Sequence, residues 1–168
     1  NYKGQPSSSQ ARLKSFVNDT NAENKIIPTR DSNEMILPGK PLAELYPEST
    51  VMFADIVGFT AWSAQREPSE VFTLLETVYR AFDRVAKKRG IFKVETIGDC
   101  YVAVAGIPEP RDDHAVAMCR FASHCKEQMH LLVHILQETL GPDTGDLTLR
   151  IGLHSGPCTA GVLRGDKS

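Results

Sequence analysis

The chain has no excess of basic residues, no long apolar run and few cysteines. Its 168 residues include 19 Lys and Arg against 21 Asp and Glu, which gives a formal net charge of −2. A nucleic-acid-binding domain usually carries a basic surface, so we expect no nucleic acid as a partner. No apolar run approaches the roughly 18 residues of a membrane-spanning helix, and the start shows no signal-peptide pattern. Because the first residue is Asn1 rather than Met, we expect a fragment of a longer protein.

The four cysteines, Cys100, Cys119, Cys125 and Cys158, form no CxxC pair and no Cys/His ligand spacing. This pattern indicates reduced thiols rather than a metal centre or a disulfide framework. We therefore expect a cytoplasmic domain. The parent protein could still carry a sensor region or a membrane anchor.

Residues 1–48 differ from the remainder of the chain. They are rich in Pro, Ser, Asn and Asp, and they show little apolar periodicity. This composition is typical of a partly disordered linker, here with a short docking turn at 41–47. We predict that the folded domain occupies residues 49–168.

From residue 51 onward, the apolar periodicity predicts alternating strands and helices. Ser69 is the expected N-cap of the first long helix. The order β-α-β-β-α-β predicts an α+β fold, a ferredoxin-like antiparallel sheet with both long helices on one face. The expected helices are 59–63, 68–89 and 112–139, and the expected strands are 51–57, 91–97, 100–105, 147–154 and, after a turn at 155–157, 158–163.

Asp55 lies near the end of the first apolar run, in the sequence VMFADIVGFT. An ionised carboxylate is costly to bury unless it binds a cation or hydrogen-bond donors. The following turn at Gly58 opens a short helix, whose free backbone N–H groups suit a phosphate. A carboxylate beside such a turn outlines a metal–nucleotide site, although a single Asp at a strand end is also common in ordinary cores.

Asp99 is the second candidate carboxylate, in the Gly98-Asp99 pair that joins two strands of an expected hairpin. In a ferredoxin-like sheet the first strand lies beside this hairpin, so Asp55 and Asp99 are expected to face each other. Two such carboxylates repel unless divalent cations lie between them. Regular alternation in the first strand of the hairpin places Lys93 and Glu95 on the same side, with Lys93 solvated.

Three motifs, FADIVGFT, FKVETIGDCYVAVAG and LRIGLHSGPCTAGV, occur in this order. Together they resemble the motifs of the class III nucleotidyl cyclase catalytic domain, shared by adenylate and guanylate cyclases, over about residues 48–163. The resemblance implies the class III cyclase fold and a phosphorus–oxygen lyase of intracellular signalling, which forms a cyclic nucleotide and pyrophosphate from a nucleoside triphosphate. It also implies a head-to-tail homodimer.

The resemblance implies that Asp55 and Asp99 bind two Mg²⁺ or Mn²⁺, with the backbone carbonyl of Ile56 as a further ligand. One metal would activate the ribose 3′-hydroxyl for attack on the α-phosphorus, and the other would hold the β- and γ-phosphates. The segment whose amides would hold the triphosphate comprises Val57, Gly58, Phe59 and Thr60.

Glu95 matches the family position that recognises the purine. A carboxylate accepts hydrogen bonds from N1–H and the 2-amino group of guanine, whereas adenine offers an acceptor at N1 and favours a donor such as Lys. The resemblance therefore implies GTP as the substrate and cyclic GMP as the product, with ATP as the alternative.

The chain ends at Ser168, before the family segment that carries the second purine contact and the Asn and Arg that stabilise the transition state. We therefore expect a C-terminally truncated domain that binds nucleotide poorly or is inactive. Two alternatives to a guanylate cyclase stay open: an adenylate cyclase, and a catalytically silent cyclase-like module for dimerisation or regulation. The presence of both Asp55 and Asp99 argues against the silent module.

Overall fold

The computed structural model describes residues 42–162. The predicted linker therefore lies largely outside the described residues, and the domain boundary at 48/49 stays a prediction. The described residues form two compact units. One comprises residues 47–157, and the other comprises residues 42–46 together with 158–162. The elements are β1 Leu42–Val57, α2 Phe59–Ser63, α3 Pro68–Arg89, β2 Phe92–Ile97, β3 Cys100–Ala105, α4 His114–Leu140, the 3-10 helix η1 Pro142–Asp146 and β4 Thr148–Val162.

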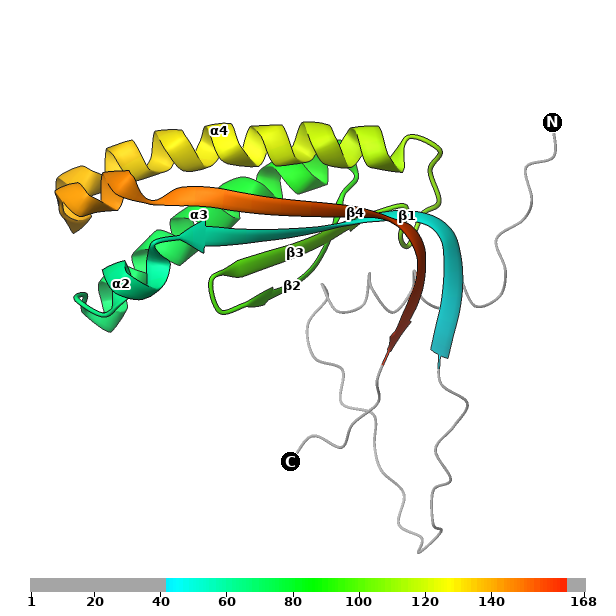
Figure 1. Cartoon of the computed structure of the whole chain (residues 1–168), viewed down its shortest axis with the longest axis horizontal. Helices are drawn as coiled ribbons and strands as arrows, with labels where there is room; N and C mark the ends of the chain where they lie inside the picture. Colours follow the sequence, from blue (N-terminus) through cyan, green and yellow to red (C-terminus); the bar gives the residue numbers. More distant parts are fainter. Residues whose placement is uncertain (1–41, 163–168) are drawn as a thin grey trace, which may run out of the picture. The chain divides into compact units, whose positions relative to one another are not determined.

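A four-stranded antiparallel sheet forms the centre of the fold, in the order β2-β3-β1-β4 (Figure 1). Asp55 of β1 lies opposite Cys100 of β3 in an antiparallel register. Thr50 contacts Ser155 and Asp55 contacts Arg150, so residue numbers in β4 fall as those in β1 rise. β4 is therefore antiparallel to β1.

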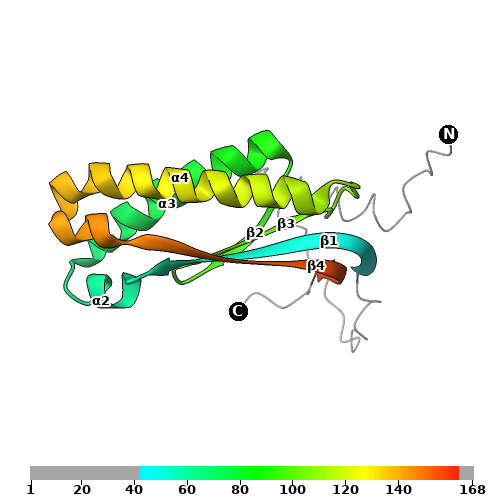
Figure 2. The same cartoon turned by 45° about the horizontal axis from the view of Figure 1, so that its top comes forward.

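Figure 2 shows α3 and α4 together on one side of the sheet. The apolar stripe of α3 packs there, with Leu74, Val78 and Phe82 fully buried. Even-numbered residues of β1 and odd-numbered residues of β3 supply the sheet side of this core, among them Met52 and Tyr101. Burial of one face of each element is what holds helices and sheet together. The predicted α+β fold with both long helices on one face is confirmed.

The start of α3 differs from the prediction. Glu67, not Ser69, is the N-cap, and it forms a capping box with Glu70. Pro68 occupies the first helical position, where its missing N–H leaves no unsatisfied donor, so the cap falls one residue before it. The helix ends as predicted at Gly90, whose φ of 63° is the left-handed conformation that glycine adopts without strain.

Two strands are longer than the sequence predicts. β1 begins at Leu42 instead of residue 51, and β4 continues through the turn expected at 155–157. Ser49 Oγ donates to the Gly156 carbonyl at 2.9 Å, and Thr50 Oγ1 lies 2.8 Å from Ser155 Oγ. These cross-strand hydrogen bonds keep the Ser-Gly segment in the extended conformation, which local turn propensity does not reveal.

The apolar residues of α4 are not all on its buried side. Val116 and Cys119 are exposed, whereas Met129 and Val133 are buried. No helix among residues 42–162 is both long and apolar enough to cross a membrane.

Candidate functional site

Asp55 lies near the end of β1, on the sheet face opposite the helices. Its neighbours Ala54 and Ile56 are buried in the core, while one-third (32%) of the Asp55 side chain is exposed. Strand alternation places Phe53 on the same face as Asp55. The main-chain position is therefore fixed by core packing while the carboxylate remains accessible.

Asp99 lies at the tip of the β2–β3 hairpin, immediately before Cys100, which pairs with Asp55 across the sheet. Burial raises the pKa of Asp99, and the Asp55 carboxylate raises it further through its charge and a side-chain hydrogen bond. The charge of Arg150 acts in the opposite direction. The structure thus brings together the two carboxylates that the sequence singled out.

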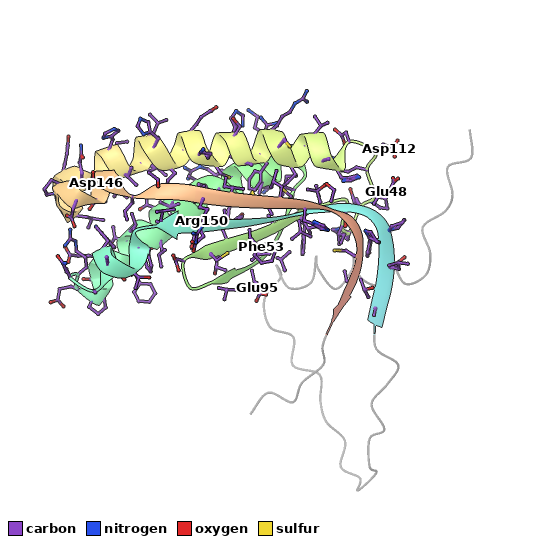
Figure 3. All side chains as sticks on the ribbon, in the orientation of Figure 1. Glu48, Phe53, Glu95, Asp112, Asp146 and Arg150 are labelled. Carbon is purple, nitrogen blue, oxygen red and sulfur yellow. The ribbon has the colours of Figure 1, made fainter. Side chains whose placement is uncertain are left out.

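Arg150 is a site residue that the sequence interpretation missed. Its Nη2 donates to Asp55 Oδ2 at 2.5 Å from the adjacent strand β4, and Figure 3 labels it there. A signal was present, because Leu149 and Ile151 alternate with Arg150 and pack toward the core. Alternation in an antiparallel strand puts Arg150 on the opposite face, where Asp55 also lies.

The turn after β1 has the expected conformation. Gly58 adopts φ 88°, ψ −8°, and α2 follows directly with the Trp62 N–H donating to the Gly58 carbonyl at 3.0 Å. A side chain at Gly58 would have to adopt a left-handed backbone conformation, which costs about 1–2 kcal/mol.

Contacts at the end of α2 hold this turn in place. Trp62 Nε1 donates to Thr144 Oγ1 at 3.0 Å, with both side chains buried. The Arg66 guanidinium lies over the Trp62 ring, 5.1 Å from its centroid, and its Nε donates to the Leu140 carbonyl at 3.1 Å. Arg66 also forms an ion pair with Asp143. The turn is thereby anchored to the end of α4 and to η1.

Glu95 lies on β2, and a bulge decides which face it occupies. Lys93 pairs with Ala103 and Glu95 with Val102, so Val94 is an extra residue between them. Lys93 consequently points to the helix side, where its Nζ lies 3.3 Å from the Asp83 carboxylate. The expectation that Lys93 shares a side with Glu95 was therefore wrong, while its side chain, expected to be solvated, is 36% exposed beside Asp83.

Because Val102 pairs with both Glu95 and Phe53, the registers place Glu95 on the face that carries Phe53 and Asp55. In Figure 3, Phe53 and Glu95 both lie on the side of the sheet away from α4. The Glu95 side chain is exposed. One sheet face thus carries the carboxylate pair and, two strands away from Asp55, a third carboxylate.

Tyr79 of α3 contributes a buried hydroxyl near the carboxylates. Burial raises its pKa, and the charges of Asp99, Cys100 and Asp55 raise it further. Within residues 42–162 this hydroxyl has no hydrogen-bond partner. The sequence interpretation assigned Tyr79 no role, since a tyrosine within an apolar helical stripe looks like core.

The carboxylates of Asp55 and Asp99 offer the hard oxygen ligands that Mg²⁺ and Mn²⁺ prefer. Within the described part of the chain, no cluster of three or more His, Cys, Asp or Glu side chains could hold a metal. His130 and His134 contact each other edge-on, with ring centroids 4.8 Å apart. Any divalent cation at Asp55 and Asp99 would therefore need backbone, water or ligand oxygens to complete its coordination.

Residues 42–168 match the family described as the adenylate and guanylate cyclase catalytic domain. The receptor-type guanylate cyclase gcy-28 of Caenorhabditis elegans is 40% identical over 141 residues, covering 83% of this chain and 10% of that protein. An adenylate cyclase of Mycobacterium tuberculosis is 35% identical over 122 residues, covering 73% of this chain and 26% of that protein. The chain thus spans only a small part of these relatives.

The fold matches as well. The guanylate cyclase domain of RhGC from Catenaria anguillulae, solved in complex with GTP, superposes with a TM-score of 0.58 at 34% identity, covering 73% of this chain and 69% of that one. Family motifs, sequence identity and fold agree, and the chain belongs to the adenylate and guanylate cyclase catalytic-domain family.

Proposed function

We propose that this domain converts GTP to cyclic GMP and pyrophosphate. The observation that carries the proposal is the common sheet face of Asp55 and Glu95, which the β1–β3 and β2–β3 registers bring about, with Asp99 beside Asp55 at the hairpin tip. A nucleotide bound along that face would meet the paired carboxylates at one end and the Glu95 carboxylate at the other.

In this proposal Asp55, Asp99 and the Ile56 carbonyl hold two divalent cations, Mg²⁺ or Mn²⁺. The residues fit such a group, because the neighbouring Asp55 carboxylate raises the pKa of Asp99 and a cation between the two carboxylates would offset their repulsion. Bound divalent cations supply charge neutralisation at the phosphates and lower the pKa of the attacking hydroxyl. The role of the chain is to hold Asp55 on β1 between the buried residues Ala54 and Ile56, beside the hairpin tip that carries Asp99.

The turn after β1 is proposed to bind the triphosphate. Gly58 redirects the backbone sharply at the end of the strand, and the contacts of Trp62 and Arg66 keep α2 in place behind it. Backbone N–H groups in such a turn are fixed donors for phosphate oxygens. The residues concerned are Val57, Gly58, Phe59 and Thr60.

Glu95 is proposed to recognise guanine. Its exposed carboxylate can accept hydrogen bonds from N1–H and the 2-amino group, which adenine cannot supply. In the reaction, the ribose 3′-oxygen forms a bond to the α-phosphorus while the bond to the β-phosphate oxygen breaks. Cyclic GMP, pyrophosphate and one proton are the products.

A head-to-tail homodimer is the proposed assembly. Large apolar side chains remain exposed on the face that carries the site: Phe53 is 53% exposed and Ile97 is 57% exposed. Large apolar side chains exposed on one face of a sheet favour contact with another protein surface. A second copy packed against this face in a two-fold arrangement would create two equivalent sites.

The deciding experiment compares GTP and ATP as substrates of the full-length protein with Mn²⁺. We expect cyclic GMP in clear excess and loss of turnover in Asp55→Asn. An excess of cyclic AMP would favour an adenylate cyclase, the activity named for the Mycobacterium tuberculosis relative, and would remove the argument from Glu95. A folded dimer without product from either nucleotide, and with dimerisation unchanged in Asp55→Asn, would favour a silent module.

A further inference from the structure

The Asp55 carboxylate already has a cation beside it, the guanidinium of Arg150. The Nη2–Oδ2 distance is 2.5 Å, and the two residues come from neighbouring strands 95 positions apart in sequence. The Arg150 side chain is 75% exposed, compared with 32% for Asp55. A guanidinium this exposed can leave the carboxylate without any repacking of the core.

The charges around Asp55 explain why a cation is held there. Asp99 lies within hydrogen-bonding reach and repels Asp55, and Arg150 attracts Asp99 as well as Asp55. One guanidinium thus offsets part of the negative charge of two carboxylates. Arg suits this place because its charge is permanent and its planar donors match carboxylate geometry.

We propose that Arg150 is a resident counter-ion that a divalent metal must displace from Asp55, so that metal binding and release of Arg150 are coupled. The inference rests on the proposed function, because it takes Asp55 to be a metal ligand. A divalent cation bound to the Asp55 carboxylate would lie a few ångströms from the Arg150 guanidinium, and the repulsion between the two positive charges would weaken the ion pair. In the metal-free chain the charge of the Asp55 carboxylate is therefore offset by Arg150. In the metal-bound chain the Arg150 guanidinium is released and stays beside the site.

The first test measures Mn²⁺ binding to the full chain without nucleotide, following free Mn²⁺ by electron paramagnetic resonance. We expect Arg150→Gln to bind Mn²⁺ about two- to five-fold more tightly than the wild type, the factor that an exposed ion pair corresponds to. The ratio between the two proteins should approach one in high salt, because salt screens exposed pairs. Asp55→Asn should lose the binding.

Arg80→Gln is the matched control. Arg80 forms an exposed ion pair with Glu76 on α3, with an N–O distance of 3.3 Å. Its replacement removes the same charge and the same type of contact away from the site, and Mn²⁺ affinity should not change.

The second test follows Arg150 itself, by the NMR signal of its Nε–H group in isotope-labelled protein. Saturating Mg²⁺ should shift this signal in the wild type, and Asp55→Asn should give a similar shift without metal. An Arg150 signal unaffected by Mg²⁺ at concentrations that occupy the site would overturn the proposal.

The outcomes separate this inference from the proposed function. Equal or weaker Mn²⁺ affinity in Arg150→Gln, with binding still dependent on Asp55, would refute displacement and leave the metal site standing. Absence of Mn²⁺ binding in both the wild type and Arg150→Gln would refute the metal site, and the inference with it. Circular dichroism would establish that each variant is folded.

Discussion

Glu95→Lys is the substitution that bears most directly on the purine bound by this domain. Glu95 is exposed on β2, and a substitution at an exposed position typically changes stability by less than about 0.5 kcal/mol. The fold should therefore survive the change. What changes is the hydrogen-bonding character of the face that carries Asp55 and Asp99, since an acceptor becomes a donor.

The expected effect on GTP follows from two lost hydrogen bonds. A hydrogen bond to a charged group contributes about 1.5–3 kcal/mol, and the exposure of Glu95 favours the lower end. Two such bonds give about 3 kcal/mol of transition-state stabilisation, which corresponds to a loss of about 100-fold in kcat/KM for GTP. Lys at this position can donate to adenine N1, so kcat/KM for ATP should stay constant or rise.

The assay measures kcat/KM for both nucleotides in the full-length protein with Mn²⁺, with the cyclic products separated by chromatography. Glu138→Lys, an equal charge reversal at an exposed position on α4, is the control and should leave the GTP to ATP ratio unchanged. A ratio unchanged in Glu95→Lys as well would show that the carboxylate does not contact the purine, and it would refute the assignment of Glu95.

Three other perturbations test separate parts of the structure. Asp99→Asn should raise the Tm of the metal-free chain at neutral pH by about 2 °C. The folded-state pKa of Asp99 is raised, so its ionised form destabilises the fold. The gain in Tm should therefore shrink as pH falls into the range where Asp99 is protonated. A thermal melt that shows an equal gain in Tm at all pH values would contradict this. Gly58→Ala should cost about 1–2 kcal/mol in urea denaturation, because φ is 88° and the new Cβ would also lie 3.4 Å from Leu147 Cδ2; a cost below about 0.3 kcal/mol would show that the turn relaxes freely. Phe53→Asp should shift the protein toward monomer in analytical ultracentrifugation, since it places a charge among exposed apolar side chains; an unchanged dimer would move the interface to another face.

Most of the fold was predictable because each long element has one periodic apolar face. The stripe of α3, with Leu74, Val78 and Phe82, identifies its buried side without any tertiary information. The extent of β4 was not predictable, because Ser155, Gly156 and Pro157 favour a turn locally. Hydrogen bonds to the Ser49 and Thr50 side chains of β1, more than 100 residues away in sequence, override that preference.

The candidate site was predictable where it depends on single residues and their motif, as for Asp55 and Asp99. It was not predictable where it depends on pairing between strands. Arg150 reaches Asp55 only because β4 lies beside β1 in a particular register. The burial of the Tyr79 hydroxyl near the carboxylates likewise follows from how α3 packs on the sheet.

The bulge at Val94 shows how much of the proposed specificity depends on register. If Val94 paired with Val102 in regular alternation, Glu95 would take the side of the sheet that Lys93 occupies, facing Asp83 and the helices. Because Val94 is an extra residue, Glu95 pairs with Val102 instead and joins Asp55 on the opposite face. Deletion of Val94 leaves Lys93 opposite Ala103 and Glu95 opposite Val102 in a regular strand, so Glu95 should stay on the face of the site and the GTP to ATP ratio should be retained. Lys93 is held on the helix side by Asp83 and lies 5.2 Å from the centroid of the Tyr101 ring. A ratio in the deletion variant as low as in Glu95→Lys would show that purine selection depends on the bulge itself and not only on the face that Glu95 occupies.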